Sequence, residues 1–252
     1  MKSKNIKKIY ASRFGGQKVE ALKNVSLEVE KGEYVAIMGE SGSGKTTLLN
    51  ILATLDKPTS GEILLNGKNI INISDKDVSA FRRDHLGFVF QDFNLLDTFS
   101  LKDNIFLPLV LSKKSYKEMK KRIVPIAKEL GISHLLDKYP YEVSGGQKQR
   151  CAVARALITS PELILADEPA GALDSKSTNG LLTLSNKINN NRQTIIMVTH
   201  SPLAASHVSR VLFIKDGEVF HQIYKGDKTN EEMYQNILDT LPLIATGGVR
   251  NE

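Results

Sequence analysis

A glycine-rich stretch near the start of the chain, GESGSGKTT, has the composition and spacing of a phosphate-binding loop. Glycines let the backbone fold around an anion, so that successive N–H groups converge on it, and the lysine adds a positive charge. The threonine after the lysine offers a hydroxyl ligand for Mg²⁺. The predicted nucleotide-binding residues are Gly39, Glu40, Ser41, Gly42, Ser43, Gly44, Lys45, Thr46 and Thr47.

Two adjacent carboxylates, Asp167 and Glu168, follow an apolar strand in the segment LILADEP. Beside a phosphate-binding loop, Asp167 would hold Mg²⁺ through water and Glu168 would polarise an attacking water as a general base. Taken alone, two acids at a strand end are more typical of an exposed turn. The loop at 39–47 makes the catalytic interpretation the better one.

A second glycine-rich segment, SGGQ at 144–147, comes directly before a helical pattern that includes CAVARAL. The start of a helix has backbone amides without intrahelical acceptors and the positive end of the helix dipole, and both attract anions. The alternative is a flexible turn capped by serine. That alternative does not account for the run GGQKQR, so we expect an anion to bind here.

The elements that position these motifs alternate between strands and helices. Apolar strands at 34–38 and 163–166 come before the first two motifs, and another strand is expected at 194–198 after a helix at about 176–189. This alternation predicts an α/β fold with a mainly parallel sheet and a helical insertion.

Turns and caps define the remaining elements. Asn66-Gly67 and Asp216-Gly217 predict two hairpins, and Lys31-Gly32 predicts a turn before the strand at 34–38. Ser115 and Glu118 form a capping box that opens a helix, which Gly131 closes. Pro125 lies inside that helix, so we expect a kink or a break there.

Composition limits the class of protein. The 252 residues are 41% hydrophobic and 25% charged, which is typical of a globular chain. The longest apolar stretches fall far short of the roughly 20 residues that a membrane-spanning helix needs, and the N-terminal segment lacks the apolar core of a secretion signal. We therefore expect the chain to stay in the cytoplasm. The single cysteine, Cys151, excludes an internal disulfide or cysteine metal cluster, and we expect it to be a packed helix residue.

The formal net charge of +6 is compatible with nucleic acid, an anionic membrane surface or an anionic ligand as partner. Lysine clusters such as SKKSYKEMKKR have helical spacing without interleaved aromatic residues. We therefore interpret them as solvated surface, with the membrane surface as the second interpretation and no nucleic-acid partner.

Six motifs together resemble those of the ATP-binding-cassette (ABC) ATPases. They are GESGSGKTT, VFQDFNLL, VSGGQ, LILADEP, GALD and VTH, in the family's order and approximate spacing, and the resemblance extends from Tyr10 to about Tyr224. It implies a P-loop NTPase fold of ABC type with a mainly parallel sheet core, an antiparallel β subdomain and a helical subdomain. The implied nucleotide-binding domain is 1–225, with the helical subdomain at about 92–160 and a short C-terminal extension at 226–252.

The resemblance also implies an active site shared by two copies of the chain. In the family, the signature segment faces the γ-phosphate of ATP that is held by the P-loop of the second copy. Carried over to this sequence, the signature residues are Ser144, Gly145, Gly146 and Gln147, and Asp174 crosses the dimer seam. An ATP-dependent head-to-tail homodimer follows, in which neither copy has a complete site.

Further roles carry over one residue at a time. Gln91 contacts Mg²⁺ or the attacking water and links the site to the helical subdomain, and His200 reaches the γ-phosphate and holds the water and Glu168 in place. The implied metal contacts are thus Thr46, Gln91 and Asp167. Tyr10 resembles the aromatic residue that stacks on adenine, with Phe14 as the alternative.

Two positions depart from the family pattern. Val143 replaces the usual leucine and Ala170 stands where threonine is common. Neither departure removes a catalytic group.

Within the family, the segments FVFQDFNLLDTFSLKDNIFLPL, ADEPAGALDSKS and IIMVTHSPLAAS and the GGV tail resemble subunits of bacitracin-type antimicrobial-peptide resistance transporters, relatives of macrolide-exporter and lipoprotein-release ATPases. This implies an ATPase on the cytoplasmic face of the membrane that powers a separate permease, which in such systems can signal to a sensor kinase. The alternative is a lipoprotein-release or cell-division ATPase with a different permease.

Two other ABC classes fit poorly. Ribosome-acting members usually carry two cassettes in one chain, and DNA-repair members need a long coiled coil for which this sequence has no room.

The segment NEEMYQNILDTL has an apolar helical face made of Met233, Ile237, Leu238 and Leu241. Contact with the permease or partner subunit and packing on its own subunit are equally compatible with this pattern.

Overall fold

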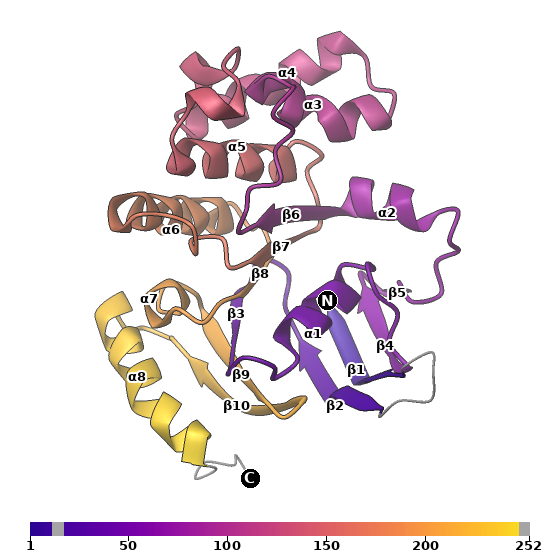
Figure 1. Ribbon diagram of the computed structural model, residues 1–252, viewed down its shortest axis with the longest axis vertical. Helices are drawn as coiled ribbons and strands as arrows, with labels where there is room; N and C mark the ends of the chain where they lie inside the picture. Colours follow the sequence, from indigo (N-terminus) through magenta and orange to yellow (C-terminus); the bar gives the residue numbers. More distant parts are fainter. Residues whose placement is uncertain (12–17, 247–252) are drawn as a thin grey trace. The chain divides into compact units, whose positions relative to one another are not determined.

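The computed structural model describes residues 1–11 and 18–246 (Figure 1). Contacts divide the chain into two compact units: unit 1 comprises Met1–Asp75 and Ile196–Glu252, and unit 2 comprises Lys76–Ile195. Phe14 and the GGV tail lie outside the described residues. Among the residues that are described, no helix has the length and apolar character needed to cross a bilayer.

Unit 1 is built on a mixed sheet with the strand order β5-β4-β1-β2-β10-β9-β3-β8. Strands β5, β4, β1 and β2 are antiparallel neighbours, β10 pairs antiparallel with β9, and β3 pairs parallel with β9. The strands are β1 (Lys2–Tyr10), β2 (Val19–Glu28), β3 (Tyr34–Met38), β4 (Ser60–Leu65), β5 (Lys68–Asn69), β8 (Ile195–Val198), β9 (Arg210–Lys215) and β10 (Glu218–Tyr224).

The sequence predicted the central strand and its turns correctly. All five residues of β3 are buried, as expected for a continuous apolar run inside a sheet. Asn66-Gly67 and Asp216-Gly217 have positive φ at both positions and join β4 to β5 and β9 to β10. Both hairpins are confirmed, and the Lys31-Gly32 turn leads into β3.

The described residues of unit 1 form the helices α1 (Lys45–Leu52), α7 (Pro202–Ala205) and α8 (Asn230–Thr246). Helix α8 packs against α7 and β10, and its residues Met233 and Ile237 are fully buried. Leu238 and Leu241 on the same face are half-buried. The apolar face of α8 is therefore largely used for packing on its own subunit.

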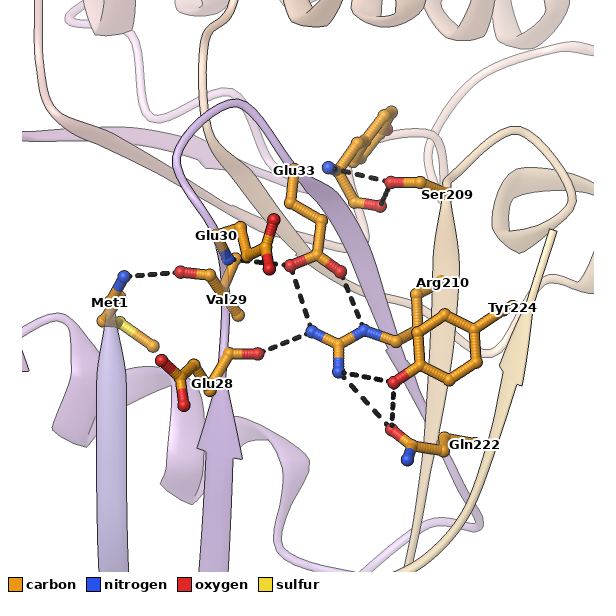
Figure 2. A network of polar contacts seen from close by, with 10 residues as sticks. Met1, Glu28, Val29, Glu30, Glu33, Ser209, Arg210, Gln222 and Tyr224 are labelled. Carbon is orange, nitrogen blue, oxygen red and sulfur yellow. Dashed lines mark hydrogen bonds and ion pairs between the residues drawn. The ribbon is translucent and has the colours of Figure 1, made fainter. Parts of the chain in front are cut away.

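An ion pair fixes the start of β3 to β9 and to the end of β2 (Figure 2). The Arg210 guanidinium donates to both carboxylate oxygens of Glu33, at 2.8 and 3.0 Å, and to the Glu28 carbonyl at 2.6 Å. The ring of Tyr224 lies 5.4 Å from the guanidinium carbon. Because the Arg210 and Glu33 side chains are only 10% and 16% exposed, water screens this bidentate pair weakly.

Unit 2 contains two parallel strands, β6 (Leu86–Phe90) and β7 (Leu163–Asp167), with Phe90 opposite Asp167. Helix α5 packs against β6 and α3. The helices are α2 (Val78–His85), α3 (Leu101–Leu111), α4 (Tyr116–Glu129), α5 (Gly145–Leu157) and α6 (Ser175–Asn190), with 3₁₀ turns at Ser133–Leu135 and Pro140–Glu142.

Helix α4 begins at the predicted cap and runs without a break through Pro125. The Ser115 hydroxyl accepts from the Glu118 amide, and Gly131, with φ of 67°, follows the helix end. The predicted break is wrong because proline removes one helical hydrogen bond, whereas Met119, Ile123 and Ala127 anchor both sides of Pro125 in the core.

Arg210→Met should lower the free energy of unfolding by about 3 to 5 kcal/mol, because it leaves the Glu33 carboxylate partly buried and unpaired. Chemical denaturation measures this loss. Lys2→Met is the matched control, since the Lys2 and Glu28 side chains are 43% and 62% exposed. That pair should contribute no more than about 1 kcal/mol. Equal unfolding midpoints for the Arg210 variant and the wild type would contradict the role of the ion pair.

Candidate nucleotide site

The phosphate-binding loop connects β3 to α1 in unit 1 and requires glycine at two positions. Gly39 has φ of 155°, and a Cβ there would lie 2.1 Å from the Ile214 carbonyl oxygen. Gly44 has φ of 103°, and a Cβ there would lie 2.5 Å from the Ala21 carbonyl oxygen. Because both neighbours are backbone atoms of the sheet, neither can move aside. The backbone of β2 and β9 thus determines the shape of the loop.

Lys45 lies across this loop. Its ammonium donates to the carbonyl oxygens of Gly39 at 2.9 Å and Glu40 at 2.6 Å. Thr46, the second residue of α1, is exposed, and the first turn of α1 has no acidic residue. The loop therefore presents a lysine, a hydroxyl and the positive end of a helix, which together suit a polyphosphate.

His200 and Tyr10 also belong to unit 1. The Thr199 amide donates to the Ile37 carbonyl of β3 at 3.1 Å, so His200 follows β8 close to the start of the loop. The Tyr10 hydroxyl donates to Asp56 at 2.7 Å and also interacts with Thr47. Burial and the Asp56 hydrogen bond raise the pKa of Tyr10.

One face of the Tyr10 ring is covered by the Lys8 ammonium, 4.7 Å from the ring centroid, and the residue is 42% exposed. A ring held by its hydroxyl and still exposed is suited to stacking on a flat base.

Unit 2 brings Gln91 and Glu168 to the same strand end, because β6 and β7 are parallel and Phe90 is opposite Asp167. Glu168 has a left-handed backbone, with φ of 45°, and its carbonyl accepts from the Gly171 amide at 2.9 Å. A Cβ at Gly171 would lie 3.1 Å from the Gln91 side-chain carbon, so Gln91 is close to this turn. Left-handed backbone at a glutamate costs energy that the surrounding turn must offset, and such strain is often found beside active sites.

The signature segment forms the N-terminus of α5. The Ser144 hydroxyl accepts from the Gln147 amide at 3.4 Å, and the Ser144 amide donates to the Gln147 side chain at 2.9 Å. Gly145 and Gly146 are in the first turn, where amides have no intrahelical acceptor. No acidic residue lies in that turn. Ser144 thus caps a regular helix rather than a flexible turn, and anion binding at the glycine amides stays a prediction.

Asp174 caps the neighbouring helix α6. Its carboxylate accepts from the Ser177 amide at 2.9 Å and from the Ser177 hydroxyl at 2.7 Å, and these hydrogen bonds lower the pKa of Asp174. A Cβ at Gly146 would lie 2.7 Å from that hydroxyl. The Asp174 cap therefore also determines what fits beside the signature glycines.

Comparisons with known proteins show which family the chain belongs to. Residues 22–171 match the family model described as ABC transporter. The chain is 48% identical to the bacitracin export ATP-binding protein BceA of Halalkalibacterium halodurans, over 100% of this chain and 98% of that protein. The chain belongs to the ABC transporter ATP-binding family.

Other relatives support the same assignment. The chain is 50% identical to the ABC transporter ATP-binding protein YxdL of Bacillus subtilis, over 99% of this chain and 95% of that protein. The macrolide export ATP-binding/permease protein MacB of Campylobacter jejuni is 47% identical over 88% of this chain but only 34% of its own length.

A solved dimeric structure of the ATP-binding cassette MJ0796, bound to ADP and Pi after hydrolysis, has a TM-score of 0.79 and 40% identity, over 88% of this chain and 97% of that one. The ABC cassette fold and ATPase activity predicted from the sequence are therefore confirmed.

Two residues of α5 in this ABC ATPase, Gln149 and Arg155, contact the backbone on either side of Gln91. Neither was predicted from the sequence as a site residue. Gln149 is fully buried. A polar residue among the apolar positions of a helix was the signal that could have identified it. Cys151 on the same helix is packed as predicted, and burial raises the pKa of its thiol to about 12.

Gly44→Ala should weaken ATP binding by the ABC ATPase roughly tenfold or more, because the new methyl group would displace the loop backbone from the geometry that cradles the phosphates. Gly42→Ala is the comparison, since a Cβ at Gly42 meets nothing within 4 Å although its φ is also positive, at 80°. It should retain more affinity. Titration with a fluorescent ATP analogue measures both, and equal affinities would contradict the contact with Ala21.

Proposed function

We propose that this ABC ATPase hydrolyses Mg²⁺-bound ATP between two copies of the chain and thereby powers a separate membrane permease in antimicrobial-peptide resistance. The observation that carries the proposal is the start of α5, where glycine amides, a capping serine and the absence of acidic residues suit a phosphate from outside the subunit. The full-length similarity to a protein named for bacitracin export supports the peptide-resistance assignment.

The phosphate chemistry follows from unit 1. Lys45 and the loop amides would bind the terminal phosphates, and the exposed Tyr10 ring would stack on adenine. In this proposal His200 orients the attacking water against the γ-phosphate.

Mg²⁺ favours oxygen donors, usually one or two carboxylates together with phosphate oxygens and water, so in this proposal Thr46, Asp167 and Gln91 would hold the ion. No cluster of three or more histidine, cysteine, aspartate or glutamate side chains suited to a metal occurs in the part of the chain that the structure describes. Bound Mg²⁺ would neutralise charge on the phosphates.

Glu168 would act as the general base, accepting a proton from the water that attacks the γ-phosphate. Its carbonyl is held by the Gly171 amide. Gln91, next to this turn, would hold the same water. The signature residues Ser144, Gly145, Gly146 and Gln147 would bind the γ-phosphate of the ATP held by the second copy, with Asp174 at the seam.

The solved relative MJ0796 is a dimeric cassette bound to the products ADP and Pi, which supports a shared site. The permease would be a separate chain, reached from the cytoplasmic face of the membrane, and could pass a signal to a sensor kinase. A lipoprotein-release or cell-division ATPase is the alternative, with the same ATP chemistry and a different permease.

Glu168→Gln should lower the ATP turnover number about 100-fold or more while leaving ATP affinity within about twofold, because the amide cannot accept the proton and the P-loop is unchanged. Steady-state phosphate release and nucleotide titration measure the two effects. Glu162→Gln is the matched control, because Glu162 precedes β7 whereas Glu168 follows that strand. The Glu162 carboxylate pairs with His85 at 2.8 Å. Unchanged turnover in the Glu168 variant would refute the role.

The same variant tests the biological assignment. Cells of the native host that carry only Glu168→Gln should become as sensitive to bacitracin-type peptides as cells that lack the chain. Retained peptide resistance together with lost ATP turnover would favour the alternative class of permease.

A further inference from the structure

We propose that Gln149 is a positioning residue for hydrolysis, which holds the two backbone segments that carry Gln91 and Glu168 through a single side-chain amide. The inference rests on the proposed function, in which those two residues act on the attacking water.

The proposal rests on a pair of hydrogen bonds inside unit 2. The Gln149 Nε2 donates to the Pro169 carbonyl at 2.6 Å and to the Phe90 carbonyl at 3.3 Å. Phe90 directly precedes Gln91 and Pro169 directly follows Glu168. One amide group therefore fixes the carbonyl of the residue next to each of the two predicted hydrolytic residues, at the adjacent ends of β6 and β7.

The burial of Gln149 shows that its donors, rather than its packing, account for a glutamine at this position. The residue is 0% exposed, and its Oε1 is buried with no hydrogen-bond partner among the described residues. An unpaired buried acceptor costs stability that a methionine or leucine of similar volume would not lose. Glutamine is therefore a poor residue for packing here but a suitable one for bridging two carbonyls.

Arg155, six residues further along α5, holds the backbone on the other side of Gln91. Its guanidinium donates to the Phe93 carbonyl at 2.8 Å and to the Asn94 carbonyl. Phe93 and Asn94 both have left-handed backbone, with φ of 60° and 47°. Helix α5 thus holds the segment that contains Gln91 both before and after that residue.

The signature glycines are at the start of the same helix. Gly146 precedes Gln149 by three residues, which is a rise of about 4.5 Å along a helix. An anion bound at the N-terminus of α5 would therefore act on the helix whose Gln149 side chain holds the backbone of the residues next to Gln91 and Glu168. This contact gives a route from occupancy of the signature segment to the geometry of water attack.

Gln149→Met removes both donors and keeps the length of the side chain. We expect the turnover number to fall roughly tenfold or more, because small displacements of catalytic groups have large effects on rate. The ATP affinity of the P-loop should stay within about twofold. Turnover is normalised to the amount of bound nucleotide at saturation, so that unfolded protein does not contribute. Gln149→Leu serves the same purpose if the methionine variant does not fold.

Gln193→Met is the matched control. The Gln193 Nε2 also donates to two carbonyls, those of Pro161 at 3.1 Å and Thr194 at 3.2 Å, beside the other end of β7. The Gln193→Met variant therefore loses the same kind of hydrogen bonds, but at a place away from Gln91 and Glu168. Its turnover should therefore stay within about twofold of the wild type. Equal normalised turnover of the Gln149 and Gln193 variants would overturn the proposal.

A double-mutant cycle separates positioning from general destabilisation. If Gln149 acts through Gln91 and Glu168, adding Gln149→Met to a variant that carries both Gln91→Ala and Glu168→Gln should lower the residual turnover by less than about twofold, since both groups being positioned are already gone. A full second reduction would overturn the proposal. Equal turnover of the wild type and Glu168→Gln would instead contradict the proposed function, while the comparison of Gln149 with Gln193 would still decide the role of Gln149.

Discussion

Phosphate binding by this chain depends on helix N-termini whose first backbone amides have no intrahelical acceptor. In the described part of the chain, two such termini follow glycine-rich or serine-capped motifs that suit phosphate, one at α1 after the P-loop and one at α5 after the signature serine. Neither has an acidic residue in its first turn, so the dipole and the amides are not neutralised locally. A triphosphate bound at one such helix N-terminus has further oxygens that can accept hydrogen bonds from the amides of a second helix N-terminus.

The remainder of each unit keeps these termini in place. In unit 1, the fully buried strand β3 leads into the P-loop, and the Arg210–Glu33 pair fixes the start of that strand. In unit 2, α5 packs on β6, and Gln149 joins it to the turn after β7. Rigid elements thus support both termini, which is the arrangement that precise positioning of a reacting group requires.

Local features were predictable from the sequence, whereas long-range polar contacts were not. The bounds of β3, the two hairpin turns and the Ser115 cap follow from short patterns whose physical cause lies within a few residues. The contacts of Gln149 join backbone carbonyls that are 59 and 20 residues away. Since any residue supplies such a carbonyl, no sequence pattern marks it as a partner.

At two further places the sequence did not determine the structure, again because contacts with distant parts of the chain decide it. Pro125 does not break α4, because tertiary packing on both sides outweighs one lost hydrogen bond. The apolar face of α8 was compatible with two partners, and only the folded chain shows Met233 and Ile237 buried on their own subunit. The site roles of Gln91 and His200 rest on the family resemblance, and that of Asp167 rests on its place at a strand end beside a phosphate-binding loop. All three remain predictions.

The most direct measurement is the molar mass of Glu168→Gln by light scattering with and without ATP. We expect a monomer without nucleotide and a dimer at saturating ATP. Gly146→Asp in the same background should bind ATP and stay monomeric, because it adds a negative charge at the start of α5 and a Cβ that would lie 2.7 Å from the Ser177 hydroxyl. A monomer at saturating ATP, or an undiminished dimer in the Gly146 variant, would contradict a phosphate bound between two copies of the chain.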